Sequence, residues 1–483
     1  MASPSIRLVE YLACLAATDL RDDLAQSATL ALLDTIGCGL YGANQRWGRI
    51  IGDLVLSEHS RGKATLYGSP QTVAPVHAAL ANGTATHGFE LDDVIPGALV
   101  HPGAVVIPAA LAAAEQYGAS GSRLITALVA GYEMTDRLSL ALGAEHNTRG
   151  FHTTGVAGAV AATVAVGIVM GFDASQLHTA IGIACSSASG IKAFTQGSGG
   201  MVKRMHAGRA AEAGVLACEL TRRGFTGPTQ AIDGRFGLLD VIGGSDTNPQ
   251  LLDRNLGASF AITRVWVKAY PCCGLLHSTA HALEALKCGH QLTPDQIKQI
   301  RIHTGRRAVE QNGEPEPRET MAAQYSLPYC AGVSLARDPR DPAAYAEENL
   351  WDPQVRTLAA RTVLCVDDHM EQIFPAHFGA RVEVELNDGR TLQNTVIDAH
   401  GTPPDPCSAA EIESKFRLLA GAVKTGDALE RIIGAVRDLP SAASLGNLSR
   451  GLRAGNSAAG RRNQTRNGPI STAIRNAGIG KEL

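Results

Sequence analysis

Five side chains that can transfer protons or bind a cation lie close together between two apolar segments. The stretch ATHGFELDDVIPGALVHPG contains His87, Glu90, Asp92, Asp93 and His101. Adjacent carboxylates followed by a histidine could supply a general base and a general acid. Carboxylates and imidazoles are also usual ligands of divalent cations, so a metal-dependent hydro-lyase is an alternative; its ligands would be His87, Asp92, Asp93 and His101. The structural interpretation is that Asp92 or Asp93 ends one helix and His101 precedes the next.

A further histidine precedes a long apolar segment. His152 lies in the Gly/Thr-rich stretch TRGFHTTGVAGA. A helix N-terminus at this point would attract an anion and lower the pKa of the imidazole. The alternative is a capping histidine without a chemical role.

The segment FTQGSGGMVKRMHAGRAAEAG combines a glycine-rich loop with positive charge. Gly199 and Gly200 belong to the loop, and Lys203, Arg204 and His206 follow on a predicted helix. Lys203 and His206 are three residues apart and so share a helix face. Loop N–H groups beside cations can form a cradle for a carboxylate, and we predict that Gly199, Gly200, Arg204 and His206 bind substrate. The alternative is a solvated basic face, which the flanking GSGG and AAEAGVLA disfavour.

Two later segments carry histidine and tyrosine. In KAYPCCGLLHSTAHALEAL, His277 and His281 are one helical turn apart and could bind a metal, although an ordinary helical pair is the simpler interpretation. In AAQYSLPYCAGVSLA, Tyr325 and Tyr329 begin an apolar helix. A buried phenol can donate to a substrate or satisfy a neighbouring group.

Several function classes are disfavoured. The sequence has no phosphate-binding loop, no dinucleotide-binding glycine pattern, no G-x-S-x-G elbow and no H-E-x-x-H motif. Its net charge of −3 gives no basic surface for a nucleic acid. The ten cysteines are scattered without a C-x-x-C pair, which is typical of reduced thiols. The first residues lack the features of a signal peptide, so we expect a cytoplasmic protein with no nucleic-acid partner.

The elements that must position these side chains change character along the chain. Apolar residues recur at helical spacing over 1–265, which predicts a helical domain. Alternating residues in IKQIRIHTG and ARVEVELNDGRTLQNTVIDA, with helices such as DPQVRTLAARTVL between them, predict a smaller α/β domain over 266–401. The second of these stretches is predicted to be a hairpin with Asn387-Asp388-Gly389 as its turn. Residues 402–449 return to helical spacing. The basic, polar segment 450–483 is predicted to be a disordered tail.

One uncharged segment approaches the length of a membrane span. It runs from Thr153 to Gly171 and consists mainly of Gly, Ala, Val and Thr. These small residues favour a buried core helix over a membrane helix. We therefore predict no membrane association.

Taken in order, several stretches resemble those of the MmgE/PrpD superfamily. They are LALLDTIGCGLYG, NGTATHGFELDD with its later HPG, GFHTTGVAGAVAA, GSGGMVKRMHAGRAAEAGVLA, KAYPCCGLLH and AQYSLPYCAGVSLA. The resemblance implies a mainly α fold, in which a large all-helical domain is completed by the C-terminal helices and carries an inserted smaller α/β lid domain. It also implies a homodimer.

The superfamily includes 2-methylcitrate dehydratase, cis-aconitate decarboxylase and iminodisuccinate epimerase, which need no metal or organic cofactor. The resemblance thus implies a cofactor-independent lyase acting on a small polycarboxylate, and the lysine in GGMVKRMH is more typical of the decarboxylase and epimerase branches. An epimerase and a non-catalytic polycarboxylate-binding protein remain alternatives. Carried over to this sequence, the decarboxylase-like site would comprise Asp92 or Asp93, His101, His152, Lys203, His277 and Tyr329.

All of these reactions develop negative charge on a carbon atom beside a carboxylate, so the site needs preorganised positive charge. Our hypothesis gives this role to Lys203, assisted by Arg204 and the glycine-rich loop. His101 or His152 would act as acid or base. Tyr329 would donate a proton from the other face, and a lid carrying His277 would exclude water.

Overall fold

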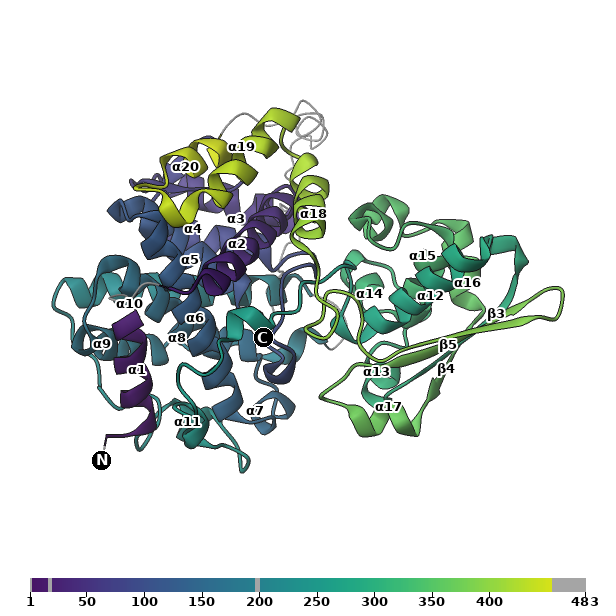
Figure 1. Cartoon of the computed structure of the whole chain (residues 1–483), viewed down its shortest axis with the longest axis horizontal. Coiled ribbons are helices and arrows are strands. Elements are labelled where there is room, and N and C mark those ends of the chain that lie inside the picture. Colours follow the sequence, from purple (N-terminus) through teal and green to yellow (C-terminus); the bar gives the residue numbers. More distant parts are fainter. Residues whose placement is uncertain (1, 16–19, 196–199, 454–483) are drawn as a thin grey trace, which may run out of the picture.

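The computed structural model describes residues 2–15, 20–195 and 200–453, which form two lobes (Figure 1). Helices from both ends of the described chain build the larger lobe, and a four-stranded sheet with shorter helices builds the smaller one. Helices far outnumber strands, so the predicted mainly α fold is confirmed.

Helices of very different lengths build the larger lobe. They are α1 (Pro4–Leu15), α2 (Asp22–Ala43), α3 (Arg46–Ser57), α4 (Pro75–Thr86), α5 (Gly103–Tyr117), α6 (Gly121–Leu142), α7 (Glu145–Thr148), α8 (Thr153–Met170), α9 (Ala174–Cys185), α10 (Met201–Arg222), α11 (Leu238–Ile242), α18 (Ala409–Gly421), α19 (Gly426–Arg437) and α20 (Gly446–Arg453). A short antiparallel pair, β1 (Ala64–Thr65) and β2 (Thr72–Val73), joins α3 to α4.

The smaller lobe combines helices and strands. Its elements are α12 (His277–His290), β3 (Ile297–Thr304), α13 (Arg306–Gln311), α14 (Thr320–Gln324), α15 (Leu327–Ala336), α16 (Pro353–Ala360), β4 (Thr362–Val366), α17 (Asp368–Ile373), β5 (Ala380–Leu386) and β6 (Thr391–Val396).

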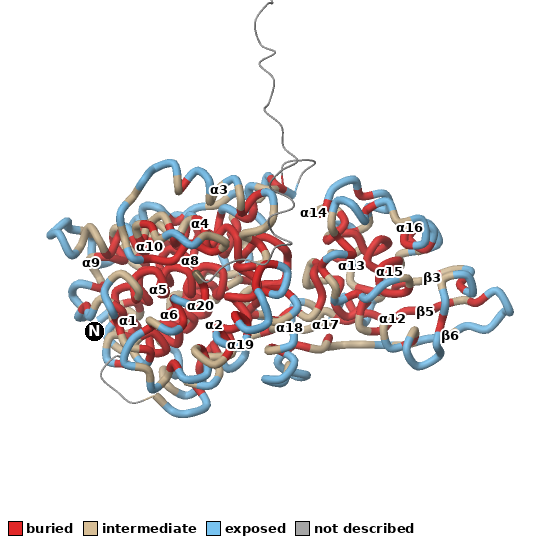
Figure 2. Tube along the Cα trace, turned by 90° about the horizontal axis from the view of Figure 1, so that it is seen from above, coloured by how far each residue is buried: buried red, intermediate tan, exposed pale blue. Residues whose placement is uncertain are grey.

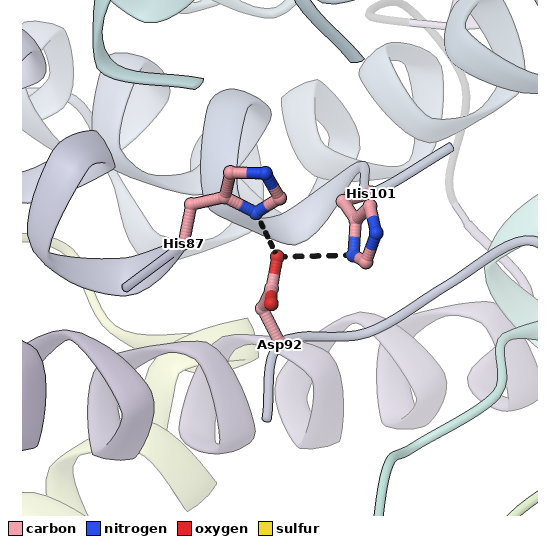
Figure 3. A group of neighbouring side chains, drawn as sticks. All are labelled: His87, Asp92 and His101. Carbon is pink, nitrogen blue, oxygen red and sulfur yellow. Dashed lines mark hydrogen bonds and ion pairs between the residues drawn. The ribbon is translucent and has the colours of Figure 1, made fainter. Parts of the chain in front are cut away.

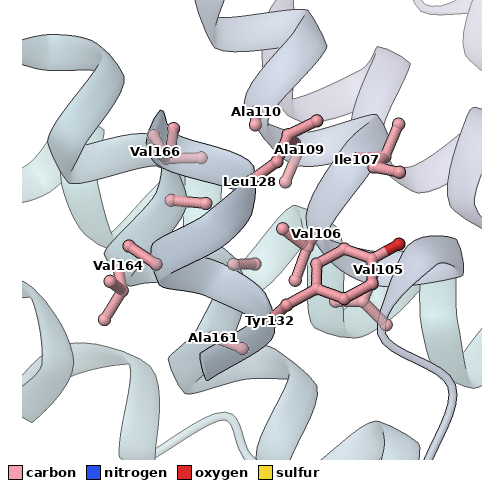
Figure 4. Packing of buried hydrophobic residues seen from close by; sticks show 14 of the residues in the cluster. Val105, Val106, Ile107, Ala109, Ala110, Leu128, Tyr132, Ala161, Val164 and Val166 are labelled. Atoms are coloured by element: carbon pink, nitrogen blue, oxygen red, sulfur yellow. The ribbon is translucent and has the colours of Figure 1, made fainter. Parts of the chain in front are cut away.

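The helix α8 forms the centre of the larger lobe. Every residue from Thr153 to Val169 is buried, and α5, α6 and α10 pack around the helix (Figure 4). Its alanines and glycines let these neighbours approach closely, which a helix built of leucine would not allow. The uncharged segment is therefore a core helix, as predicted, although its length and composition would also suit a membrane span.

The crossing of α4 and α10 brings two parts of the candidate site together. A Cβ atom on Gly83 would lie 2.9 Å from the Cα atom of Gly208, and one on Gly208 would lie 2.2 Å from the carbonyl oxygen of Leu80. Only glycine permits this close approach. As a result, the N-terminal turn of α10, which carries Lys203, faces the turn that follows α4 and carries Glu90.

The sheet has the strand order β4-β3-β5-β6. The predicted hairpin is confirmed: β5 and β6 are antiparallel, and Gly389 in their connecting turn has φ of 91°. The prediction that DPQVRTLAARTVL is wholly helical is wrong. The helix α16 ends at Ala360, and the β-branched segment Thr362–Val366 then pairs in parallel with β3, which supplies partners for its backbone.

The two hydrophobic cores meet at the junction between the lobes, and both have buried interiors (Figure 2). The core of the smaller lobe also includes side chains from the larger one, among them Trp47, Phe89 and Leu91. The chain passes from the larger lobe to the smaller one near residue 265, and the core of the smaller lobe draws side chains from both sides of that point. At the C-terminal end, α20 continues through Arg453 with Leu452 buried, so the predicted start of the tail at 450 is too early. The remainder, 454–483, lies outside the described residues.

Replacing Gly208 by alanine should destabilise the protein, because the added methyl group would overlap the backbone of α4. We expect a loss of about 1–3 kcal/mol in the free energy of unfolding, measured by urea titration. Gly434→Ala on α19 is the matched control, since nothing lies within 4 Å of a Cβ atom there. That variant should be neutral or slightly stabilising. Equal stability of Gly208→Ala and wild type would contradict the close crossing.

Candidate active site

A cavity of about 870 Å³, including the space open to solvent, lies between the two lobes. Both lobes line it, with polar as well as apolar side chains. The charged and polar side chains are Glu90, His101, Asn147, His152, Lys192, Thr195, Lys203, Lys268, Arg307, Gln311 and Tyr325; the larger apolar ones are Val94, Leu99, Phe194, Trp266, Leu275, Phe374 and Phe378.

Glu90 is the only carboxylate that lines this cavity in the described part of the chain, and it is buried. Lys203 from α10 donates to its Oε1 atom, and Lys268 Nζ lies 3.3 Å from its Oε2 atom. Burial opposes ionisation of Glu90, but the two ammonium groups outweigh it and lower the pKa of the carboxyl group. The Tyr325 hydroxyl accepts from Lys203 at 2.9 Å and lies 3.3 Å from Glu90 Oε1.

The turn that presents Glu90 is held in an unusual conformation. Glu90 has φ of 57°, a left-handed value that a residue with a Cβ atom rarely adopts. Side chains from three helices donate to carbonyl groups of this turn: Arg204 to Gly88 at 2.7 Å, Gln324 to Phe89 at 2.8 Å and Lys415 to Leu91 at 2.7 Å. These bonds keep the turn in place and so fix the direction of the Glu90 side chain.

Asp92 lies behind the cavity wall and connects two histidines (Figure 3). Its Oδ2 atom lies 2.6 Å from Nδ1 of His87 and 3.1 Å from Nδ1 of His101. Burial opposes the negative charge of Asp92, but the two rings outweigh this effect and lower its pKa well below the usual value. His87 is fully buried, which lowers its pKa to about 4, whereas His101 reaches the cavity. Asp92 therefore orients His101 and leaves its Nε2 atom directed away, available for proton transfer.

His152 and His206 form a second pair of rings beside this group. Their Nδ1 atoms are 3.0 Å apart, so one ring must donate and the other accept. Burial lowers the pKa of both rings, to about 4 for His206. His152 lines the cavity from the N-terminus of α8, whereas His206 lies behind it against Phe194. The pair is uncharged near neutral pH.

Two predicted site residues, Asp93 and Arg204, make contacts within the protein and do not line the cavity. Asp93 accepts hydrogen bonds from the Gly103 N–H at 2.8 Å and from the Tyr132 hydroxyl at 2.6 Å, so it anchors the start of α5. Desolvation raises its pKa to about 7. The guanidinium group of Arg204 lies 3.8 Å from the ring centroid of Trp47 rather than in the cavity.

The structure does not place Gly200 at the cavity wall either. Gly200 directly precedes α10 and packs against Met321, whose sulfur would lie 2.1 Å from an added Cβ atom. Gly199 lies outside the described residues.

The structure does not bring His277 or Tyr329 to the cavity. His277 is fully buried behind Trp266, with Nε2 lying 3.3 Å from the carbonyl oxygen of Cys272. The Tyr329 hydroxyl donates to the carbonyl oxygen of Ala344 at 3.1 Å, inside the core of the smaller lobe.

Four residues that were not among the predicted site residues line the cavity: Lys192, Lys268, Arg307 and Tyr325. Lys268 and Tyr325 lie in the same sequence stretches as His277 and Tyr329, and it is Lys268 and Tyr325 that line the cavity. Lys192 and Arg307 are single cations in unremarkable contexts, and no sequence signal marks them.

A divalent cation could approach three of the four predicted metal ligands. The ligand atoms of His87, Asp92 and His101 lie within 4.8 Å of one another. Asp93 cannot join them without breaking its bonds to Gly103 and Tyr132. The metal-dependent alternative thus retains three of its ligands.

Protonation of His206 should weaken the fold. Since its pKa falls from 6.5 to about 4 on folding, the unfolded chain binds a proton between these pH values that the folded chain does not. The contribution of this histidine is fully present above pH 6.5 and is lost as the pH falls through that window, by roughly 3 kcal/mol at most. In His206→Gln, the free energy of unfolding should therefore fall less steeply on acidification, as measured by urea titration at a series of pH values.

The exposed His290 provides the control for this experiment. His290→Gln should follow the wild-type pH dependence, whereas His206→Gln should not. Parallel curves for His206→Gln and wild type would show that this ring titrates alike in both states.

Comparison with known proteins agrees with the resemblance seen in the sequence. The MmgE/PrpD N-terminal domain matches residues 6–250, and the MmgE/PrpD C-terminal domain matches residues 270–440. A cis-aconitate decarboxylase-like protein of Aspergillus oryzae is 30% identical over 89% of this chain and 93% of its own length. The cis-aconitate decarboxylases of Aspergillus terreus and Homo sapiens are 28% and 27% identical over 85% and 87% of this chain, and over 87% and 88% of their own lengths. The chain belongs to the MmgE/PrpD family.

Proposed function

We propose that this protein is a lyase that decarboxylates cis-aconitate or a closely similar unsaturated tricarboxylate in the cavity between its lobes. The observation that carries the proposal is the charge of that cavity. Among the described residues, four cationic side chains, Lys192, Lys203, Lys268 and Arg307, line it together with a single carboxylate, Glu90. Such a site attracts a polyanion and stabilises negative charge that develops during a reaction.

The chemistry follows from the substrate. The carbon–carbon bond to the carboxylate on the saturated carbon breaks, CO2 leaves, and the electron pair remains on that carbon. The pair is delocalised through the double bond to the carbon beside the other terminal carboxylate, which takes up a proton. The product is a dicarboxylate with a terminal methylene group. Lys203 and Lys268 would bind the carboxylate on which the negative charge accumulates.

Tyr325 is the proton donor in this proposal. Desolvation, followed by the charge of Glu90, raises its pKa well above the usual value, so the phenol keeps its proton near neutral pH. Lys203 donates to the same oxygen and would stabilise the phenolate left after transfer. The apolar surfaces of Trp266, Leu275 and Phe378 provide a weakly solvated place from which CO2 departs.

Dehydration and epimerisation, the two other reactions of the family, make different demands on the site. A dehydratase would need an acid directed at a leaving hydroxyl group. An epimerase would need proton donors on both faces of the substrate, and His101 together with Tyr325 could provide them. The curated relatives over nearly the whole chain carry the name cis-aconitate decarboxylase or decarboxylase-like, which favours decarboxylation.

Proton NMR in D2O with cis-aconitate, 2-methylcitrate, citrate and iminodisuccinate tests the proposal. We expect cis-aconitate to be converted to the methylene dicarboxylate with one deuterium incorporated, and equally fast with a chelator present. Loss of turnover with chelator would favour the metal-dependent alternative at His87, Asp92 and His101. Turnover of one of the other three compounds would indicate a different reaction, and binding without any turnover would favour a non-catalytic binding protein.

The two tyrosines on neighbouring helices should behave differently when each loses its hydroxyl group. Tyr325→Phe should lower kcat by about 100-fold or more, because a proton donor is removed from the cavity. Tyr329→Phe is the matched control and should keep turnover, while losing about 1 kcal/mol of stability with its hydrogen bond to Ala344. Steady-state kinetics and thermal unfolding measure both. The reverse pattern would restore Tyr329 to the mechanism.

A further inference from the structure

Two cations at the entrance to the cavity have surroundings unlike those of the deeper lysines. Lys192 belongs to the 3-10 turn Lys192–Thr195 of the larger lobe, and Arg307 belongs to α13 of the smaller lobe. Both side chains approach the same acceptor, the Oδ1 atom of Asn147. Lys192 Nζ lies 2.9 Å from it and the Nη2 atom of Arg307 lies 3.5 Å from it.

Asn147 is oriented for this role by its other amide atom. Its Nδ2 group lies 3.4 Å from both the Phe151 carbonyl oxygen and the Thr153 hydroxyl, so Oδ1 faces the two cations. Asn147 thus brings two positive groups from different lobes to one point. An amide oxygen carries only a partial charge and cannot neutralise them.

Within the described residues, neither Lys192 nor Arg307 forms an ion pair with a carboxylate. By contrast, Lys203 and Lys268 share Glu90. The four residues that follow Thr195, with the sequence Gln-Gly-Ser-Gly, contain no acid either. The uncompensated positive charge of the cavity is therefore concentrated at its entrance.

This arrangement is electrostatically unfavourable without an anion. Both side chains are partly buried, and the pKa of Lys192 is lowered by desolvation and then by the Arg307 guanidinium group. Like charges held together in a partly desolvated site repel each other. A carboxylate between them would remove the repulsion and accept charge-assisted hydrogen bonds from both groups.

We propose that Lys192 and Arg307, bridged by Asn147, form a subsite for the carboxylate on the central carbon of a tricarboxylate, so that the cavity prefers such a ligand over one of the same chain length that lacks this carboxylate. The inference rests on the proposed function, because it assigns the second retained carboxylate of the same substrate to this subsite. The deeper lysines bind the carboxylate next to the reacting carbon atoms. The third carboxylate, which leaves as CO2, then has no cation of its own and faces the apolar wall.

Binding of two unreactive ligands tests this subsite without requiring turnover. Tricarballylate and glutarate share a carbon chain and differ by one carboxylate. Isothermal titration calorimetry on the full-length wild type should show tricarballylate binding at least about tenfold more tightly than glutarate. Lys192→Met and Arg307→Gln should each weaken tricarballylate about tenfold or more and glutarate much less.

Two further variants make the result specific. Arg306→Gln removes a neighbouring exposed cation from the same helix, outside the cavity, and should keep the wild-type ratio of affinities. Lys192→Arg, which keeps the charge, should retain most of the preference. An unchanged ratio in Lys192→Met and Arg307→Gln, or a wild type without preference, would overturn the subsite.

The outcomes also separate this inference from the proposed function. A protein that leaves cis-aconitate unchanged but loses its preference for tricarballylate in these variants would keep the subsite and disprove the decarboxylase. A protein that decarboxylates cis-aconitate with unchanged ligand preference in the variants would do the opposite.

Discussion

The buried contact of Glu90 with Lys203 and Lys268 is the interaction on which the site depends. Removing three charges from water costs several kcal/mol for each group unless they compensate one another. Here one carboxylate serves two ammonium groups, and the phenol of Tyr325 completes the cluster. The partners come from the turn after α4, from α10, from the segment between the lobes and from the end of α14. The cluster can form only when both lobes are in place.

The charges around this cluster nearly balance its net positive charge. The imidazoles of His87, His152 and His206 are buried and have lowered pKa values, so they add no positive charge near neutral pH. Asp92 supplies negative charge behind the wall, where it orients His101. The inner site is thus nearly compensated and the entrance is positive. The positive entrance attracts a polyanion, and the hydrogen-bond donors inside the cavity, Lys203 and Lys268, are already in place to bind it.

Much of this architecture could be predicted from the sequence. The absence of charge and the many small residues identified α8 as a core helix, and the Asn-Asp-Gly turn identified the hairpin of β5 and β6. The strand β4 was missed because it continues a helical pattern and depends on its parallel partner β3, which is distant in sequence. For the site, the sequence motifs predicted which segments line the cavity more reliably than which side chain of each segment does so.

The reason is that side-chain direction depends on tertiary contacts. Asp92 and Asp93 are adjacent, yet one meets two histidines and the other anchors α5. Lys203 reaches the cavity, whereas Arg204 points to the turn that positions Glu90. Lys192 and Arg307 become partners only because the two lobes meet, and no local pattern encodes that meeting.

The most direct measurement of the central claim is a crystal structure of the protein with tricarballylate bound. We expect the ligand between the lobes, with one carboxylate within hydrogen-bond distance of Lys203 or Lys268 and another between Lys192 and Arg307. Tyr325 should lie beside the carbon chain. A ligand bound elsewhere, or bound in the cavity without contact to these cations, would contradict the account.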